Sequence, residues 1–178
     1  PDQTVQQVKR EMDNDEWRFE AHDEVYDPQQ ISAIILDKLA NDAEEYLGDS
    51  VDSAIITVPA YFSEKERQAT KNAGEIAGLD VEHILPEPSA ACLSYGLNKA
   101  KTDTGESEQE IAFVYDLGGG TFDATLVDIA DDYSMIETLN TEGDHDLGGE
   151  DWTERIVSWI IEEIEQETGV NVRDDLEQ

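Results

Sequence analysis

The stretch IAFVYDLGGGTFDATLVD, from Ile111 to Asp128, constrains the fold of this chain more than any other. Two runs of apolar, β-branched and aromatic residues flank three consecutive glycines, a pattern that predicts strand, tight turn and strand. Asp116 ends the first run, and Thr121 and Asp123 follow the glycines. The turn therefore has a carboxylate on each side and a hydroxyl at its end.

Such a turn is suited to hold a phosphate and a metal ion. Glycines have no Cβ atom, so their backbone amides approach a ligand closely and form an anion nest. Mg²⁺ prefers oxygen ligands and keeps several waters, so Asp116 and Asp123 are candidates to hold a hydrated ion. The spacing matches neither a Walker loop nor a dinucleotide fingerprint, because both lead from glycines into a helix. On these residues alone, a hairpin that happens to have a glycine-rich turn is the alternative.

The residues before this hairpin predict a parallel βαβ unit. Short apolar runs at 54–58 and 81–85 are suited to buried strands. Between them, Ser63 and Glu66 form a capping box for a helix that ends at Gly78. Strand, crossover helix and strand are the parts of a parallel unit.

The remaining segments predict three further helices and several smaller elements. One helix begins at Pro28, after the capping residue Asp27, and stops at Gly48. The other elements are a short helical segment within 1–16, a hairpin at 17–26, a helix at 87–97, a polar connection at 98–110, a third antiparallel strand at 133–140, a loop at 143–149 and a helix that begins at Glu150 and Asp151. Apolar residues lie on one stripe of the first helix, form the packed face of the second and form the apolar face of the third: Ile31, Ile35, Leu39 and Tyr46; Ala90, Ala91, Leu93 and Leu97; Trp152, Ile156, Ile160 and Ile164.

The composition is strongly acidic, with 44 Asp and Glu against 11 Lys and Arg and a formal net charge of −33. This field repels nucleic acids and anionic membranes. Self-repulsion also opposes folding at low salt, so we expect a protein from a high-salt cytoplasm, where the charge is screened. Clear helix and strand periods exclude a disordered acidic chain.

Other features narrow the class of protein further. No apolar run is long enough to cross a bilayer, and no signal peptide is visible. The chain begins without methionine, so we expect an internal piece of a longer protein. Its single cysteine, Cys92, excludes an internal disulfide and is more typical of a core residue than of a nucleophile. The histidines have no metal-ligand spacing: His22, His83 and His145.

Four stretches in this order resemble the nucleotide-binding domain of DnaK-type heat-shock chaperones. They are ITVPAYFSEKERQATKNAGEIAGL from Ile56, EPSAACLSYGL from Glu87, VYDLGGGTFD from Val114 and GDHDLGGEDW from Gly143. The resemblance covers nearly the whole chain and implies an α/β, actin-like ATPase (ribonuclease H-like) fold, incomplete, with parts of two lobes. The acidic composition further resembles versions from salt-loving archaea. The implied domains are 1–30, a remnant of the small subdomain of lobe I; 31–102, the core of lobe I; 103–110, a connection; and 111–178, the core of lobe II.

The resemblance also implies roles for the residues around the glycine turn. The phosphate-binding loop would be Gly118, Gly119, Gly120 and Thr121. Asp116 and Asp123 would hold magnesium through water, and Thr121 would be the hydroxyl that family members autophosphorylate. Gly148 and Gly149 resemble the glycines that lie near the ribose and phosphates.

Residues far from the turn match further functional positions of the family. Lys9 matches the lysine that reaches the γ-phosphate, and Glu87 the carboxylate that orients the metal shell and the attacking water. Pro59 and Arg67 match the pair that relays nucleotide state to a peptide-binding domain. Without the resemblance, each has a plainer interpretation: a solvated lysine, an N-terminal helix residue, a strand terminator and an exposed helix charge. The chain departs from the family pattern at Asp13, Pro86, Ser89 and Glu142.

The implied function is the ATP-binding and ATP-hydrolysing part of a cytoplasmic stress-response chaperone, which couples hydrolysis to binding and release of unfolded polypeptides. The implied cofactors are ATP or ADP, Mg²⁺ and K⁺. The implied partners are unfolded clients, a J-domain co-chaperone and a nucleotide-exchange factor, with no nucleic acid or membrane. We expect little ATPase activity from these 178 residues alone, because the first phosphate loop and the adenine-binding lobe are absent. The alternative is a non-catalytic nucleotide-sensing or filament-forming module on the same fold.

Overall fold

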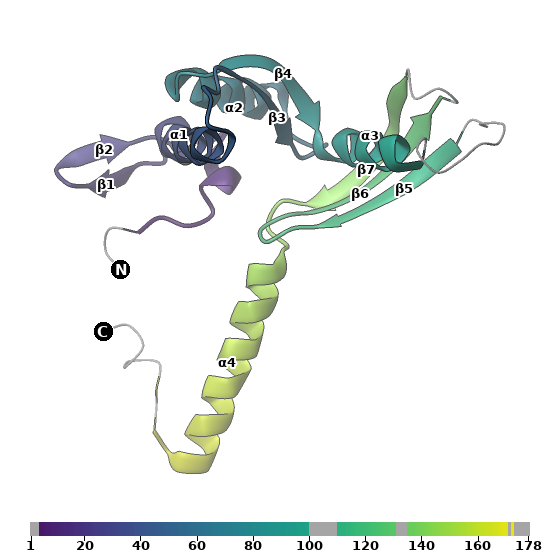
Figure 1. Cartoon of the computed structure of the whole chain (residues 1–178). Coiled ribbons are helices and arrows are strands. Elements are labelled where there is room, and N and C mark those ends of the chain that lie inside the picture. Colours follow the sequence, from purple (N-terminus) through teal and green to yellow (C-terminus); the bar gives the residue numbers. More distant parts are fainter. Residues whose placement is uncertain (1–3, 100–109, 131–134, 171, 173–178) are drawn as a thin grey trace. The chain divides into compact units, whose positions relative to one another are not determined.

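The computed structural model describes residues 4–99, 110–130, 135–170 and 172 (Figure 1). Its mixed α/β fold divides into two compact units. The first unit comprises Pro1–Asp116 and Asp123–Gly143, and the second comprises Leu117–Phe122 and Asp144–Gln178. Residues 103–109 of the expected connection lie outside the described residues.

The first unit begins with a single helical turn and a small hairpin, both as expected. The helical turn is the 3-10 helix η1 (Val8–Glu11). Strands β1 (Phe19–Ala21) and β2 (Glu24–Tyr26) pair antiparallel. The ring of Trp17 stacks on that of Phe19, with their centroids 6.4 Å apart.

Helix α1 (Pro28–Leu47) begins and ends where the sequence predicts. The Asp27 carboxylate accepts the backbone N–H of Gln30 at 2.8 Å, and Gly48 ends the helix at φ 72°. Only the first turns are buried, however, because η1 and α2 pack there. The apolar stripe is therefore buried at Ile31, whereas its later members are exposed: Ile35, Leu39 and Tyr46.

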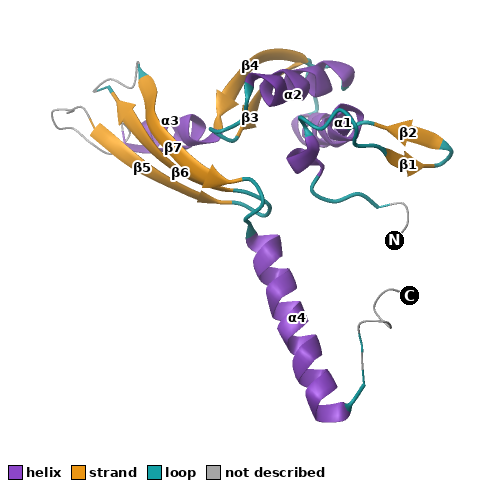
Figure 2. Ribbon diagram, turned by 180° about the vertical axis from the view of Figure 1, so that it is seen from behind, coloured by secondary structure: helices purple, strands orange, loops and turns teal. Residues whose placement is uncertain are grey.

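The predicted parallel βαβ unit is confirmed. Strands β3 (Ser53–Val58) and β4 (Asp80–Pro86) pair parallel, and α2 (Glu64–Ile76) packs against both strands and against α1 (Figure 2). The prediction of a buried β3 holds only at its end, where Val58 is 1% exposed, whereas Ile55 is 57% exposed. The reason is that this sheet has two strands among the described residues, so β3 lies at its edge.

Helix α3 (Glu87–Lys99) packs on a second sheet, of order β5-β6-β7. The arrows in Figure 2 show that the three strands alternate in direction: β5 (Glu110–Leu117), β6 (Phe122–Ile129) and β7 (Ile136–Asp144). The third strand is thus confirmed, but it continues to Asp144 rather than ending at 140. The predicted loop therefore begins two residues later, at His145.

The core between α3 and this sheet contains Cys92, Val127 and Ile129. The predicted buried face of α3 is wrong at Leu93, which is 41% exposed, because Cys92 points to the sheet instead. Burial, and secondarily the charge of Glu110, raises the pKa of the Cys92 thiol. The prediction of a core cysteine is confirmed.

The second unit contains helix α4 (Gly149–Thr168), which ends at Gly169 with φ 71°. Its position along the sequence is as predicted, and most of its apolar face is exposed. Ile161 is 8% exposed, whereas the predicted stripe is exposed: Trp152, Ile156, Ile160 and Ile164. Periodicity locates the apolar face of a helix but does not supply the surface that covers it.

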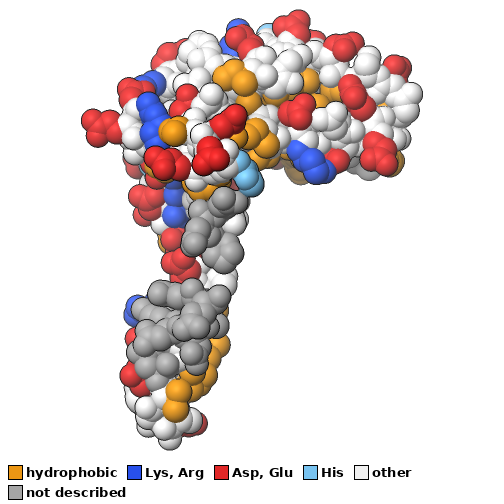
Figure 3. All heavy atoms as spheres, turned by 90° about the vertical axis from the view of Figure 1, so that its left-hand side faces the viewer, with side chains coloured by type: hydrophobic (Ala, Val, Ile, Leu, Met, Phe, Trp, Pro, Cys, Tyr) orange, Lys and Arg blue, Asp and Glu red, His pale blue; other side chains and the backbone are white. Residues whose placement is uncertain are grey.

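Acidic side chains are spread over the visible face in Figure 3, among fewer basic ones. Within the described residues, no helix combines the length and the apolar character that crossing a membrane requires.

Candidate functional site

The glycine turn and the first turn of α4 form a hydrogen-bonded assembly within the second unit. The N–H of Gly118 donates to the carbonyl of Thr121 at 2.9 Å, which closes the turn. The N–H groups of Gly149 and Glu150 donate to the carbonyls of Gly118 and Gly119, both at 2.9 Å. The first N–H groups of a helix have no carbonyl of a preceding turn to bond, and here two of them bond the glycine turn.

Gly148 is placed where no larger residue fits. A Cβ atom on Gly148 would lie 2.4 Å from the carbonyl carbon and oxygen of Gly119 and from the nitrogen of Gly120. Its own backbone is extended, at φ −159° and ψ −175°, so the need for glycine is steric rather than conformational. A Cβ on Gly119, by contrast, would meet nothing within 4 Å. The turn therefore leaves no room for a side chain at Gly148, whereas the space beside Gly119 is open.

Asp151 holds Gly148 in this position. Its carboxylate accepts the backbone N–H of Gly148 at 2.7 Å, reaching back from the third residue of α4. A carboxylate there is also favoured by the helix dipole. The sequence indicated Asp151 as a helix-start residue, but its role in holding the glycine required the structure.

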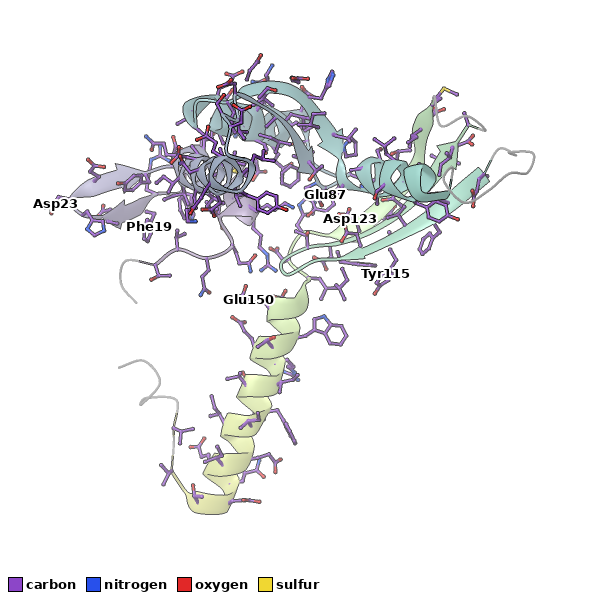
Figure 4. All side chains as sticks on the ribbon, in the orientation of Figure 1. Phe19, Asp23, Glu87, Tyr115, Asp123 and Glu150 are labelled. Atoms are coloured by element: carbon purple, nitrogen blue, oxygen red, sulfur yellow. The ribbon has the colours of Figure 1, made fainter. Side chains whose placement is uncertain are left out.

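The two aspartates that flank the turn in sequence differ in burial. Asp123, at the start of β6, is 2% exposed, whereas Asp116, near the end of β5, is half-buried. Figure 4 shows Asp123 at the turn end of β6 and Glu87 where α3 begins. Thr121 is half-buried. Among the described residues, no three His, Cys, Asp or Glu side chains gather into a metal-binding cluster.

Lys9 and Glu87 meet within the first unit, although 78 positions separate them. Lys9 Nζ lies 2.8 Å from Glu87 Oε1, and the side chains are 45% and 22% exposed. Lys9 is on η1, which is anchored by the buried Val8 and followed by the buried Met12. Glu87 is the first residue of α3, directly after β4. Lys9 and Glu87, which were matched separately to residues that act in ATP hydrolysis, are therefore in contact.

Pro59 and Arg67 belong to the junction between β3 and α2. Pro59 is fully buried, and Arg67 donates from Nε to the carbonyl of Phe62 at 2.9 Å and from Nη2 to that of Ala60 at 3.0 Å. The plainer interpretation of Arg67 as an exposed helix charge is wrong, because the side chain is half-buried and bonded to the loop. The loop after β3 is thus held by the helix that follows it.

The structure brings the predicted residues together in two groups. One group, in the first unit, contains Lys9 and Glu87; the other, in the second unit, contains the glycine turn with Gly148 and Gly149. Sequence reasoning missed Lys65, whose Nζ lies 2.7 Å from both the Asp13 carbonyl and an Asp15 carboxylate oxygen. No local pattern signals that contact, because about 50 residues separate the partners.

Comparisons with known proteins agree with the family resemblance of the four sequence stretches. The model of the family described as "Hsp70 protein" matches residues 2–178. The chain is 46% identical over 175 residues to proteins named "Chaperone protein DnaK" from Thermotoga petrophila, Thermotoga sp. strain RQ2 and Thermotoga maritima.

This chain belongs to the Hsp70 family. The alignment covers 98% of the chain but 28% of each of these relatives, so the chain spans less than a third of their length. The match gives no support to the alternative of a filament-forming module.

Proposed function

We propose that this chain is part of the nucleotide-binding domain of an Hsp70-type chaperone with an actin-like fold. In this proposal residues 1–102 belong to lobe I and 111–178 to lobe II, joined by the connection at 103–110. The complete protein hydrolyses ATP and couples hydrolysis to binding and release of unfolded polypeptides. The family match over residues 2–178 supports this proposal.

The contact between Lys9 and Glu87 carries the proposal. Phosphoryl transfer to water needs positioning and charge neutralisation more than covalent chemistry. A lysine is suited to stabilise the oxygens of a γ-phosphate, and a carboxylate to orient an attacking water. An ammonium and a carboxylate 2.8 Å apart supply both functions at one place.

The chemistry of the donor set also suits a magnesium nucleotide. Asp116 and Asp123 offer only carboxylate oxygens, which Mg²⁺ prefers, and two such ligands leave room for waters and phosphates. Open space at Gly119 allows a phosphate to approach the backbone of the turn. When bound, Mg²⁺ neutralises charge on the phosphates.

For Gly148 and Gly149 we propose a supporting role beside the nucleotide. The amide of Gly149 donates to the turn, and Gly148 permits the close approach. Thr121 would contribute the hydroxyl of the phosphate loop and the autophosphorylation site. Pro59 and Arg67 would relay nucleotide state, since their loop and helix are bonded to each other.

The remaining elements of the proposal concern the complete protein. We expect it to use K⁺ as well as Mg²⁺, to act in the cytoplasm, and to work with a J-domain co-chaperone and a nucleotide-exchange factor. Clients would bind through a domain outside these residues. The charge of −33 accords with work at high salt.

Steady-state ATP turnover of the complete protein, in concentrated KCl with Mg²⁺, tests this function. Lys9→Ala should lower kcat about 100-fold, the typical effect of removing one group that stabilises transition-state charge. Lys38→Ala is the matched control, because Lys38 is an exposed lysine that pairs with Asp42 on the outer part of α1. Equal turnover by the two variants would contradict the assignment of Lys9.

A further inference from the structure

We propose that Lys65 is a positioning residue for Lys9. It ties the segment that carries Lys9, residues 8–17, to the first turn of α2. This inference rests on the proposed function of Lys9. Lys65 touches neither Lys9 nor any group assigned to the nucleotide, so it would act only through the backbone of the Lys9 segment.

The tie between this segment and α2 consists of two hydrogen bonds from the ammonium group of Lys65. Lys65 Nζ donates to the backbone carbonyl of Asp13 at 2.7 Å and to the carboxylate of Asp15 at 2.7 Å. Both acceptors lie within six residues of Lys9 in the same segment. Charge-assisted bonds of this length are stronger than neutral ones, so one side chain fixes two points of the segment.

The tie acts on the exposed stretch between the buried Met12 and the half-buried Trp17. Val8 and Met12 are buried, and the hydroxyl of Ser32 on α1 donates to the sulfur of Met12 at 3.4 Å. Residues 13–16 are exposed. Among the described residues, the side chain of Asn14 bonds within the segment, to Glu11 and to the backbone amides at 16 and 17. The long-range bonds to residues 13–16 that the structure shows come from Lys65.

The first turn of α2 is a rigid place for this anchor. Ser63 and Glu66 make a reciprocal capping box, with the N–H of Ser63 donating to the Glu66 carboxylate at 2.7 Å, and Glu66 is 7% exposed. The next residue, Arg67, bonds two carbonyls of the loop after β3. The same helical turn therefore fixes the Lys9 segment through Lys65 and the Pro59 loop through Arg67.

The two bonds of Lys65 differ in expected strength. Asp15 is 81% exposed and Lys65 52% exposed, and exposed ion pairs contribute little because water and salt screen them. The Asp13 carbonyl is a fixed backbone acceptor, so holding it requires no ordering of a second side chain. We therefore expect removal of Lys65 to have a larger effect than removal of the Asp15 charge alone.

Amide hydrogen exchange of the complete protein tests the tie directly. Lys65→Ala should speed exchange in peptides covering residues 8–17 about two- to fivefold, the range set by the loss of an exposed charged contact. Asp15→Asn should give a smaller increase, and Lys65→Arg should restore slow exchange. The matched control is Lys71→Ala, also on α2, whose ammonium lies 3.9 Å from Glu75 in the same helix. Equal exchange in the Lys65→Ala and Lys71→Ala variants would overturn the proposal.

ATP turnover of the complete protein then separates this inference from the proposed function. We expect Lys65→Ala to lower kcat several-fold with little change in the KM for ATP, and to have no further effect in a Lys9→Ala background. If Lys9→Ala lowers turnover but Lys65→Ala does not, positioning by Lys65 is refuted and the role of Lys9 stands. If Lys9→Ala has no effect, the proposed function and this inference both fail.

Discussion

Replacement of Gly148 by alanine tests how α4 is attached to the glycine turn. The added methyl group would lie 2.4 Å from three backbone atoms of Gly119 and Gly120, a separation that real Cβ atoms do not show. Backbone cannot rotate away as a flexible side chain can. The turn and the start of α4 must therefore separate in the Gly148→Ala variant.

The expected loss follows from the bonds that this separation breaks. Among the described residues, two backbone hydrogen bonds join α4 to the turn, from Gly149 to Gly118 and from Glu150 to Gly119, each 2.9 Å long. A typical intramolecular hydrogen bond contributes about 0.5–1.5 kcal/mol net. Losing both costs about 1–3 kcal/mol, which corresponds to about a 5- to 150-fold change in a local opening equilibrium.

The assay is amide hydrogen exchange by NMR, read at the N–H of Glu150 in both variants. Gly149→Ala is the matched control, because a Cβ there would lie 3.7 Å from the Gly118 carbonyl oxygen and 3.9 Å from Gly119 Cα, which is ordinary contact. Protection of Glu150 should fall in the Gly148→Ala variant and persist in the Gly149→Ala variant. Equal protection in both variants would refute the steric reasoning.

Three further predictions concern stability and reactivity. Gly74→Ala should lower the free energy of unfolding in urea by about 1–3 kcal/mol, since its Cβ would crowd Val81 Cγ2 at 2.4 Å; an unchanged midpoint would contradict this packing. Burial first, and the charge of Glu110 second, raises the pKa of the Cys92 thiol. Iodoacetamide should therefore react slowly with the folded protein near pH 8 and rapidly in urea. The stabilising effect of the neutral thiol is complete below the pKa of the unfolded state and is lost as pH rises above it. The melting temperature should be higher in 1 M KCl than in 0.1 M KCl, because the charge of −33 is then screened over about 3 Å rather than about 10 Å. An unchanged melting temperature would count against adaptation to high salt.

The positions of helices and turns were predictable because their signals are local. Asp27 before Pro28, and Ser63 with Glu66, mark the helix starts that the structure shows. Capping groups act within one helical turn, so a single short stretch of sequence contains the complete signal. The parallel pairing of β3 and β4 followed from the strand–helix–strand order for a similar reason, since a parallel connection needs a crossover.

Buried faces were predicted less well, because burial depends on what covers a surface. Tyr46 and Trp152 lie on apolar stripes of correctly located helices, yet they are 90% and 60% exposed. Cys92 was expected in the core, but Leu93 was expected there as well and is 41% exposed. The neighbours of a helix decide which of its faces is buried. The periodicity of the helix sequence carries no information about those neighbours.

The family and the glycine turn with its flanking aspartates are evident in the sequence because each is a short pattern of residue types, and the candidate site residues follow from the resemblance to that family. The folded arrangement was needed to show that Lys9 contacts Glu87, that Lys65 reaches Asp13 and Asp15, and that Gly148 must be a glycine. These contacts join segments about 30 to 80 positions apart. Their geometry depends on packing between distant elements, and the residue types at each end fit many other pairings equally well.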